Sequence, residues 1–400
     1  MAHRVVITGL GPVSGIGIGV AEFAEALRLG KSGVGPIGSF DTAGFERTVA
    51  GEVPAFRPQE LLRRLDRAQW GRSSLFAAAA ARLAVEDAGV ETAGRDVAVV
   101  MGTTSGEVVP VVDMTEGWHR DGWQSMPDPE LARRVPASRI AVAAARELGS
   151  TGEAVTVATA CSAGNYTIGY AYDLISSGEV DVAVAGGADS VARFTHAGFH
   201  RLGALAAEQC RPFDRDRDGI LTAEGGVALV LEDRDAALAR GARIYAEVLG
   251  YGMSCDAKHP VAPDAESIAR GIRVAHQRAG VRADQVDYIC AHGTGTRTND
   301  LVEGGALFDV FGPTPPPVSS IKSMLGHTMG AASGFGAVAC ALSIAQGFLP
   351  PTVNHLHHDP ELAGIDPVPN SSRPTRVRIA QNNGFAFGGN NAIVLFGEAG

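Results

Sequence analysis

The two halves of this sequence carry the same order of strand and helix signals. The matching segments are DVAVVMGTTSG (96–106), CSAG (161–164) and GGVALVLE (225–232) in the first half, and VDYICAHGTGT (286–296), HTMG (327–330) and GNNAIVLFGE (389–398) in the second. In each half, a helix-like stretch of small residues follows the middle segment. The repetition predicts two related α/β units, 1–245 and 246–400, with Cys161 and His327 at equivalent helix starts near a shared pseudo-twofold axis.

Short runs of β-branched residues alternate with alanine-rich segments, which is typical of a layered α/β architecture. Strands are predicted at residues 4–8, 97–101, 154–157, 180–185, 226–231, 286–290, 318–320, 377–381 and 392–396. Helices are predicted at residues 19–29, 70–88, 136–148, 164–177, 265–279, 300–311 and 331–346. Two irregular insertions, 104–135 with Trp118 and Trp123 and 350–375, interrupt the pattern, and loops of this length often carry function.

Charge and cysteine content exclude several classes of protein. The chain has 400 residues and a formal net charge of −10, which argues against nucleic acid as the main partner because phosphate binding needs a basic surface. The five cysteines are odd in number and form no CxxC pair, so neither a disulfide framework nor a zinc site is expected. The apolar stretch 334–349 is shorter than the roughly 20 residues that span a bilayer. We therefore predict a cytoplasmic protein with no membrane contact.

Cys161 follows an apolar strand and opens a helix of small residues. The positive end of that helix favours thiolate, and its free N–H groups would hold a developing oxyanion. His292 in HGTGT (292–296) and His327 in KSMLGHTMGAASG (322–334) follow downstream. Together these residues predict a nucleophilic site able to form carbon–carbon bonds. The alternative is a buried structural cysteine with two turn histidines.

Three other motifs suggest ligands but lack the required spacing. GLGPVSGIGIG (9–19) hints at a dinucleotide fingerprint, yet its glycines are wrongly spaced. DRDRDGILTAE (214–224) resembles a calcium loop, but Glu224 comes one residue too early, so a salt-bridged structural loop is expected. The histidines of NHLHHDP (354–360) are expected in a solvated loop. We therefore predict no metal site.

A series of motifs runs nearly from end to end of the chain. They are VVITGLGPVS (5–14), RRLDRAQ (63–69), VEDAG (85–89), TACSAG (159–164), AGGAD (185–189), RPFDRDRDG (211–219), EGG (224–226), HGTGT (292–296), KSMLGHTMGAASG (322–334), PPTVN (350–354) and NNGFAFGGNNA (382–392). In this order they resemble the β-ketoacyl-acyl-carrier-protein synthases of the elongating type, the condensing enzymes of fatty-acid and type II polyketide synthesis. The resemblance implies a thiolase-like fold of two similar βαβ-rich halves in a layered α-β-α-β-α arrangement.

The resemblance also implies a role for each residue that matches a family position. Cys161 would take an acyl chain from a carrier protein as a thioester, and its N–H and that of Phe387 would form the oxyanion hole. His292 and His327 would donate hydrogen bonds to the thioester carbonyl of malonyl-carrier protein and stabilise the enolate formed as carbon dioxide leaves. The carbanion would then attack the acyl-cysteine, with no metal or organic cofactor.

Further positions match supporting residues of the family. Lys322 would support the two histidines through Glu303. Thr294 and Thr296 match threonines that hydrogen-bond the pantetheine arm. Phe385 matches a gating aromatic whose loop separates acylation from condensation, and the neighbouring glycines would let that loop move.

The resemblance implies two kinds of protein partner. Arg63, Arg64 and Arg67 lie where the family has basic residues that receive the acidic carrier protein, and a spacing of one helical turn would gather them into one patch. The alternative is a solvated helix face. The assembly is expected to be a homodimer, or a heterodimer with a chain-length-factor-like subunit, and the 104–135 insertion suits such an interface.

Departures from the family pattern refine these expectations. The segment 102–123 differs from the housekeeping fatty-acid enzyme, Glu107 is polar where the acyl pocket should begin, and Asn390 replaces a common threonine. These departures favour a specialised polyketide-type synthase, with a housekeeping elongation synthase as the alternative. A coenzyme A thiolase would need a second cysteine near the C-terminus, where this chain has phenylalanines. A non-catalytic chain-length partner would lack Cys161.

Overall fold

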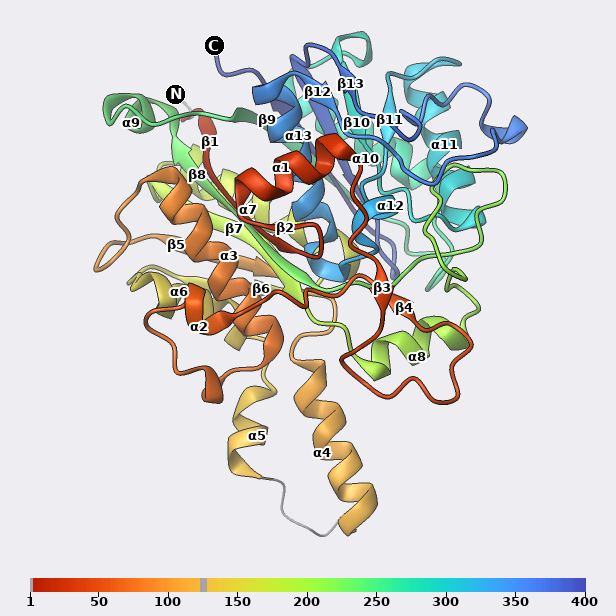
Figure 1. Ribbon diagram of the computed structural model, residues 1–400. Helices are drawn as coiled ribbons and strands as arrows, with labels where there is room; N and C mark the ends of the chain where they lie inside the picture. The colour runs from red at the N-terminus through yellow and green to blue at the C-terminus, as the bar shows by residue number, and fades with distance from the viewer. Residues whose placement is uncertain (1–2, 123–127) are drawn as a thin grey trace.

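A mixed β-sheet organises the chain (Figure 1), for which a computed structural model describes residues 3–122 and 128–400. Within those residues the sheet has eleven strands in the order β11-β10-β14-β15-β9-β1-β8-β7-β5-β6, with β2 paired to β1. The strands are β1 (Val5–Ser14), β2 (Gly17–Ile18), β5 (Ala98–Gly102), β6 (Ala154–Val157), β7 (Val182–Asp189), β8 (Gly225–Asp233), β9 (Ala246–Cys255), β10 (Tyr288–Cys290), β11 (Val318–Ser319), β14 (Ile379–Gly384) and β15 (Asn390–Gly397).

The strand order reads the same outward from the β1–β9 pair in both directions. Strands β6, β5 and β7 are parallel, as are β11, β10 and β14, and each set is followed by antiparallel neighbours. The two halves are joined where Val5 pairs with Val248 and Ile7 with Ala246. This symmetry confirms the predicted pair of similar halves. The division at 245/246 stays a prediction, and β9 begins at Ala246.

Helices on three levels complete the predicted α-β-α-β-α layers (Figure 1). Helices α3 (Arg72–Ala88) and α6 (Arg139–Leu148) pack on the strands of the first half, and α10 (Ala265–Ala279) packs on those of the second, with α11 (Arg297–Phe311) against α10. Helices α7 (Ala163–Ser176) and α13 (Ala332–Gln346) lie between the halves and contact strands of both.

The remaining elements are short or peripheral. They are α1 (Val20–Leu29), α2 (Pro58–Leu61), α4 (Val108–Asp121), α5 (Pro129–Arg134), α8 (Arg193–Arg201), α9 (Arg234–Ala239), α12 (Lys322–Leu325), β3 (Gly35–Pro36), β4 (Val49–Ala50), β12 (Phe348–Leu349), β13 (Arg373–Pro374), and the 3-10 helices η1 (Arg67–Gln69), η2 (Ala160–Ser162), η3 (Ala283–Gln285), η4 (Met329–Ala331) and η5 (Pro360–Leu362).

The two central helices approach each other through glycine. A Cβ atom on Gly164 of α7 would lie 2.4 Å from the backbone nitrogen of Gly334 in α13, so α7 has no room for a side chain at this position. The segment Met329–Gln346 is long and apolar enough to cross a bilayer, but 89% of it is buried inside the protein. It is the core helix that the close packing requires.

The insertion at 104–135 contains helices that the sequence did not predict. Helices α4 and α5 project from the body of the molecule (Figure 1), and residues 123–127 between them, including Trp123, lie outside the described residues. Glu107 is buried at the start of α4, where its Oε1 accepts a hydrogen bond of 2.7 Å from the N–H of Ser74. Its carboxylate thus caps the first turn of α3, which explains the unexpected polar residue.

The contact between the central helices predicts a matched pair of substitutions. Gly164→Ala forces a methyl group against the α13 backbone and should lower the free energy of unfolding by about 1–3 kcal/mol. Gly305→Ala, in α11 where the added Cβ meets open space, should raise it by about 0.5–1 kcal/mol because alanine favours helix. Urea unfolding measures both, and equal effects would contradict the packing account.

Candidate active site

A cavity of about 410 Å³ collects most of the predicted site residues. Its lining includes, among others, Cys161, His292, Thr294, Thr296, His327, Phe385 and Phe387. Lys322 and Glu303 are buried directly behind His292. The three arginines Arg63, Arg64 and Arg67 do not line the cavity. Residues from both halves of the chain therefore meet at one site.

Cys161 lies in the tight turn η2 that opens α7. The residue before it, Ala160, has a φ of 50°, and Met329 at the start of η4 has a φ of 51°. The two turns are therefore equivalent, as predicted, but the position matching Cys161 is Gly330, and His327 stands three residues earlier. The duplication aligns the two helix starts, and of the two matched positions one is Cys161 and the other is Gly330.

Burial dominates the chemistry of the Cys161 thiol. Desolvation raises its pKa to about 11, although the charge of Lys322 and the backbone N–H groups of Phe387 and Cys161 itself act in the opposite direction. The expected preference for thiolate is therefore wrong for the free enzyme, because desolvation outweighs Lys322 and the two N–H groups that favour the anion. The two N–H groups that favour the anion are the predicted oxyanion-hole pair.

The two histidines face each other as neutral donors. Their ring centroids are 5.6 Å apart at an interplanar angle of 80°. Burial and the charge of Lys322 lower the pKa of both rings well below the ordinary histidine value. Nδ1 of His327 accepts a hydrogen bond of 3.1 Å from the N–H of Met329, which leaves the proton on Nε2. His327 thus has an N–H available for a ligand.

Lys322 and Glu303 hold the backbone of His292 from both sides. Nζ of Lys322 donates to the carbonyl oxygen of His292 over 2.5 Å. Glu303 accepts from the N–H groups of His292 at 2.9 Å and Gly293 at 2.7 Å, and from the side chain of Asn383 at 3.0 Å. Each residue reaches His292 directly, so the expected relay from Lys322 through Glu303 is not needed to fix this histidine.

Asp189 is a supporting residue that the sequence reasoning missed. Its carboxylate accepts from the hydroxyl of Thr103 at 2.7 Å and from the N–H groups of Thr104, Ser105 and Gly330 at 2.7, 3.1 and 2.7 Å. Burial raises its pKa to about 6. Asp189 ties the end of β5 to the turn η4, and the signal for it was an acid at the end of the buried strand AGGAD.

Of the predicted carrier-docking arginines, Arg63 and Arg64 lie in the loop between α2 and η1, and Arg67 is the first residue of η1. A single buried carboxylate, that of Glu147, accepts from the N–H groups of Arg63 at 2.8 Å and Arg64 at 3.0 Å. Arg63 pairs with Glu86 at 3.3 Å, and Arg67 begins η1. Residues 63–66 are not helical, so the expected spacing of one helical turn is wrong, while all three side chains are at the surface.

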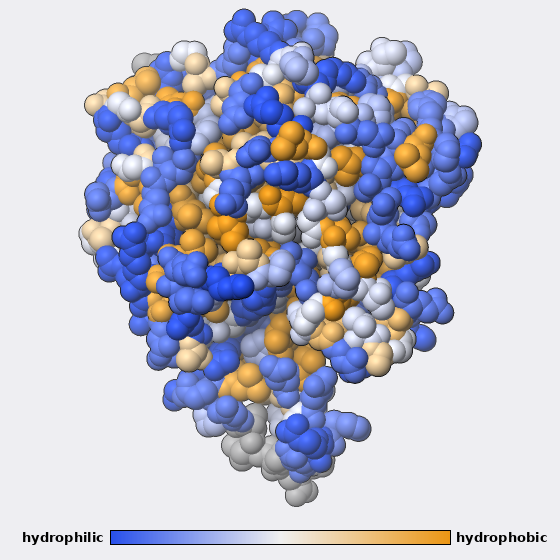
Figure 2. Space-filling model, in the orientation of Figure 1, coloured by the Kyte–Doolittle hydropathy of each residue, from blue (hydrophilic) through white to orange (hydrophobic). Residues whose placement is uncertain are grey.

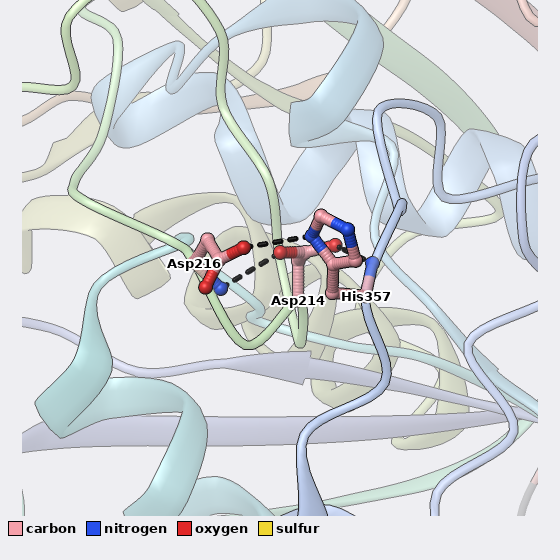
Figure 3. A group of neighbouring side chains, drawn as sticks. All are labelled: Asp214, Asp216 and His357. Atoms are coloured by element: carbon pink, nitrogen blue, oxygen red, sulfur yellow. Dashed lines mark hydrogen bonds and ion pairs between the residues drawn. The ribbon is translucent and has the colours of Figure 1, made fainter.

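Residues from two of the dismissed metal motifs lie close together, but their side chains already have hydrogen-bond and ion-pair partners. Asp214, Asp216 and His357 lie together (Figure 3), with Nδ1 of His357 at 2.7 Å from Asp216. The oxygens of Asp214 already accept three backbone N–H groups, and Arg215 pairs with Asp216 at 3.0 Å. A metal would have to displace these bonds.

Beside this group, the loop is salt-bridged as predicted. Buried Arg217 pairs with Asp359 at 2.6 Å and with Asp300 at 3.7 Å. Asp300 in turn accepts a hydrogen bond of 2.8 Å from the N–H of Phe213. These contacts tie residues 213–217 to the start of α11.

Comparison with known proteins decides the family. Residues 2–237 match the family model described as beta-ketoacyl synthase, N-terminal domain, and residues 245–356 match the corresponding C-terminal domain. The chain belongs to the β-ketoacyl synthase family. It is an acyltransferase of the condensing type.

Relatives and solved structures of the same family match this chain over nearly its whole length. The 3-oxoacyl-[acyl-carrier-protein] synthase 2 of Synechocystis is 36% identical, over 98% of this chain and 97% of that protein. The structure of the ishigamide ketosynthase/chain length factor is 51% identical with a TM-score of 0.98, covering 100% of both chains. AntDE:AntF, a type II polyketide carrier protein in complex with its ketosynthase, is 29% identical with a TM-score of 0.88, again covering 100% of both chains.

The raised pKa of Cys161 predicts a pH profile for alkylation of this β-ketoacyl synthase. Because iodoacetamide reacts with thiolate and the pKa is about 11, the rate at Cys161 should climb about tenfold per pH unit from pH 7 to 10. Peptide mass spectrometry measures it. In the urea-unfolded chain the rate should level off above about pH 8.5. A plateau below pH 9 in the folded protein would contradict the dominance of burial.

Proposed function

We propose that this β-ketoacyl synthase joins an acyl group held on Cys161 to a malonyl group delivered by an acyl carrier protein, with loss of carbon dioxide. The observation that carries the proposal is one cavity in which a buried thiol, two backbone N–H groups and two neutral histidines face the same space. Such a site provides a nucleophile for acyl transfer and separate donors for an enolate.

In the first half-reaction, the sulfur of Cys161 attacks the acyl thioester on the carrier. The oxyanion that forms accepts hydrogen bonds from the N–H groups of Cys161 and Phe387. The carrier's sulfur leaves and takes the proton that the cysteine thiol has lost. Because the resting thiol has a raised pKa, the thiol must lose its proton after the acyl carrier has bound. In the absence of the carrier the thiol stays protonated, and its reaction with other electrophiles is slow.

In the second half-reaction, the carbonyl of the malonyl thioester lies between His292 and His327. Decarboxylation leaves an enolate whose oxygen accepts from Nε2–H of His327 and from His292. The nucleophilic carbon attacks the acyl carbonyl, a carbon–carbon bond forms, and the sulfur of Cys161 leaves as thiolate and takes a proton from water, which restores the resting thiol. Lys322 and Glu303 act by positioning His292. Atoms and charges balance over the two half-reactions without a metal or organic cofactor.

The mouth of the cavity suits a pantetheine arm. The hydroxyls of Thr294 and Thr296 are 2.9 Å apart at its wall and offer partners for the arm's amides. Phe385 is buried with its ring 5.5 Å from that of His292, so it must move before an extended acyl group passes. Phe387 is 42% exposed and packs on Phe199 with centroids 5.8 Å apart. We assign Phe385 as the gate.

The proposed setting is type II polyketide or specialised fatty-acid synthesis in the cytoplasm. The 51% identity and TM-score of 0.98 to the ishigamide ketosynthase/chain length factor favour a polyketide-type chain that works with a second subunit. The AntDE:AntF complex supports an acyl carrier protein as the delivering partner. Likeness to 3-oxoacyl synthase 2 keeps housekeeping elongation as the alternative. We retain the boundary at 245/246 for the two halves.

Intact-mass spectrometry with a panel of acyl-carrier thioesters tests the condensing reaction. Wild type should gain an acyl group and Cys161→Ala should not. His327→Ala should still be acylated but lose condensation with malonyl-carrier protein by at least about a hundredfold, because one enolate donor is gone. Equal loss of both steps in His327→Ala would contradict the assigned division of labour.

The docking assignment is tested by charge reversal. Arg63→Glu/Arg64→Glu should weaken binding of a carrier protein about tenfold or more, because rim charges steer acidic partners. Iodoacetamide alkylation of Cys161 should be unchanged. The matched control is Arg282→Glu/Arg376→Glu, which changes the same charge at exposed positions of the other half. Equal carrier affinity in the two double variants would overturn the assignment.

A further inference from the structure

Four buried polar side chains, here called the polar network, lead from helix α10 to the backbone of His292. His276 of α10 is 7% exposed. Gln381 and Asn383 of β14 and Glu303 of α11 are each at most 1% exposed. Hydrophilic residues otherwise cover much of the molecular surface, where water solvates them (Figure 2). Proteins rarely leave buried polar groups without hydrogen bonds, so each of these four side chains needs a partner.

Three side-chain hydrogen bonds link the polar network in order. Nε2 of His276 lies 2.7 Å from Oε1 of Gln381, and Nε2 of Gln381 lies 2.8 Å from Oδ1 of Asn383. Nδ2 of Asn383 lies 3.0 Å from Oε1 of Glu303. Gln381 and Asn383 are alternate residues of one strand, so their side chains point to the same face of the sheet and meet there.

The carboxylate of Glu303 fixes the direction of every donor in the polar network. Its two oxygens already accept two backbone N–H groups, so it acts as an acceptor toward Asn383 as well. The amide oxygen of Asn383 then accepts from Gln381, and the amide oxygen of Gln381 accepts from Nε2–H of His276. Burial lowers the pKa of His276, which keeps its ring neutral. All the donors therefore point toward the carboxylate, an arrangement in which hydrogen bonds strengthen one another.

The polar network ends on the backbone of an active-site histidine. Glu303 accepts the N–H of His292 over 2.9 Å. At the far end, Phe311 of α11 holds the ring of His276, with centroids 5.5 Å apart at an interplanar angle of 75°. Neither His276 nor Gln381 lines the cavity that the described residues form. Any effect of these two residues on the reaction must therefore pass through their neighbours.

We propose that His276 is a positioning residue for condensation, which acts through the polar network to fix His292 as a donor to the enolate. This inference rests on the proposed function, in which His292 stabilises that enolate. Without Nε2–H of His276, the oxygen of Gln381 is buried with no donor. Its amide then turns, and the hydrogen bonds that follow it toward Glu303 weaken. A small displacement of a fixed donor lowers its stabilisation of the developing charge.

His276→Phe tests the proposal, because its ring fills the same site and cannot donate a hydrogen bond. The kcat for condensation with malonyl-carrier protein should fall about tenfold, while KM and the rate of Cys161 acylation stay within about twofold of wild type. Acylation is spared because the oxyanion-hole N–H groups lie outside the polar network. His276→Gln offers an amide N–H in place of Nε2–H and should recover most of the rate. The control is Ser267→Ala, which removes a hydrogen bond of 3.0 Å from Arg270 in the same helix and should leave condensation unchanged.

Gln381→Met cuts the polar network between its two ends, because methionine has a similar length and no amide. If His276 acts through the network, His276→Phe should lower condensation no further in a protein that already carries Gln381→Met. Three results would overturn the proposal. They are an unchanged kcat in His276→Phe, a further fall of about tenfold in the double variant, and a loss of acylation equal to the loss of condensation.

Hydrogen exchange gives a readout that needs no catalysis. Because the polar network holds the N–H of His292, a peptide spanning 290–296 should exchange faster in His276→Phe and in Gln381→Met than in wild type or the control variant. Mass spectrometry measures this rate, and wild-type exchange in both variants would contradict the proposal. A wild-type protein that neither acylates nor condenses would count against the proposed function instead, and exchange alone would then decide whether the network fixes His292.

Discussion

The close approach of the two central helices is the constraint on which the site depends. Because Gly164 and Gly334 bring α7 and α13 into backbone contact, the tight turns η2 and η4 that begin these helices also touch. One turn holds Cys161, and the other begins two residues after His327. The carboxylate of Asp189 then ties η4 to the end of β5. A wider helix crossing would separate Cys161, the proposed nucleophile, from the proposed enolate donors His292 and His327, even though all three residues were still present.

Before substrate binds, the thiol and the two imidazole rings of the site are uncharged. Burial disfavours charge on sulfur and on both imidazole rings, and the buried cation Lys322 is held against a carbonyl oxygen and near Glu303. Donors that are already fixed and uncharged need little rearrangement when negative charge develops on an oxygen. The same desolvation that holds the thiol protonated therefore strengthens each hydrogen bond to the reacting groups.

Much of this organisation follows from the sequence, because it depends on local patterns. Each predicted strand overlaps an observed one, although β1 runs to Ser14 and so extends six residues past its predicted end. The Cys161, His292 and His327 motifs converge as expected. Strand β9 was missed because Val248 is its one β-branched residue and Gly250 and Gly252 lie within it. Helices α4 and α5 were missed because prolines and acidic residues interrupt the helical pattern of the sequence in this segment. The protonation state of Cys161 depends on the desolvation of its whole surroundings, which no local pattern reports, and Asp189 acts through contacts distant in sequence.

The left-handed turns at Ala160 and Met329 have almost the same φ, yet a thiol follows only the first of them. The unusual backbone is therefore a property of the junction between sheet and central helix. It cannot be understood as strain stored to activate a thiol, because the half without a thiol has kept it too. Duplication of an ancestral unit would have placed the same turn at the start of both central helices. The two copies then diverged, and only one of the turns acquired a cysteine.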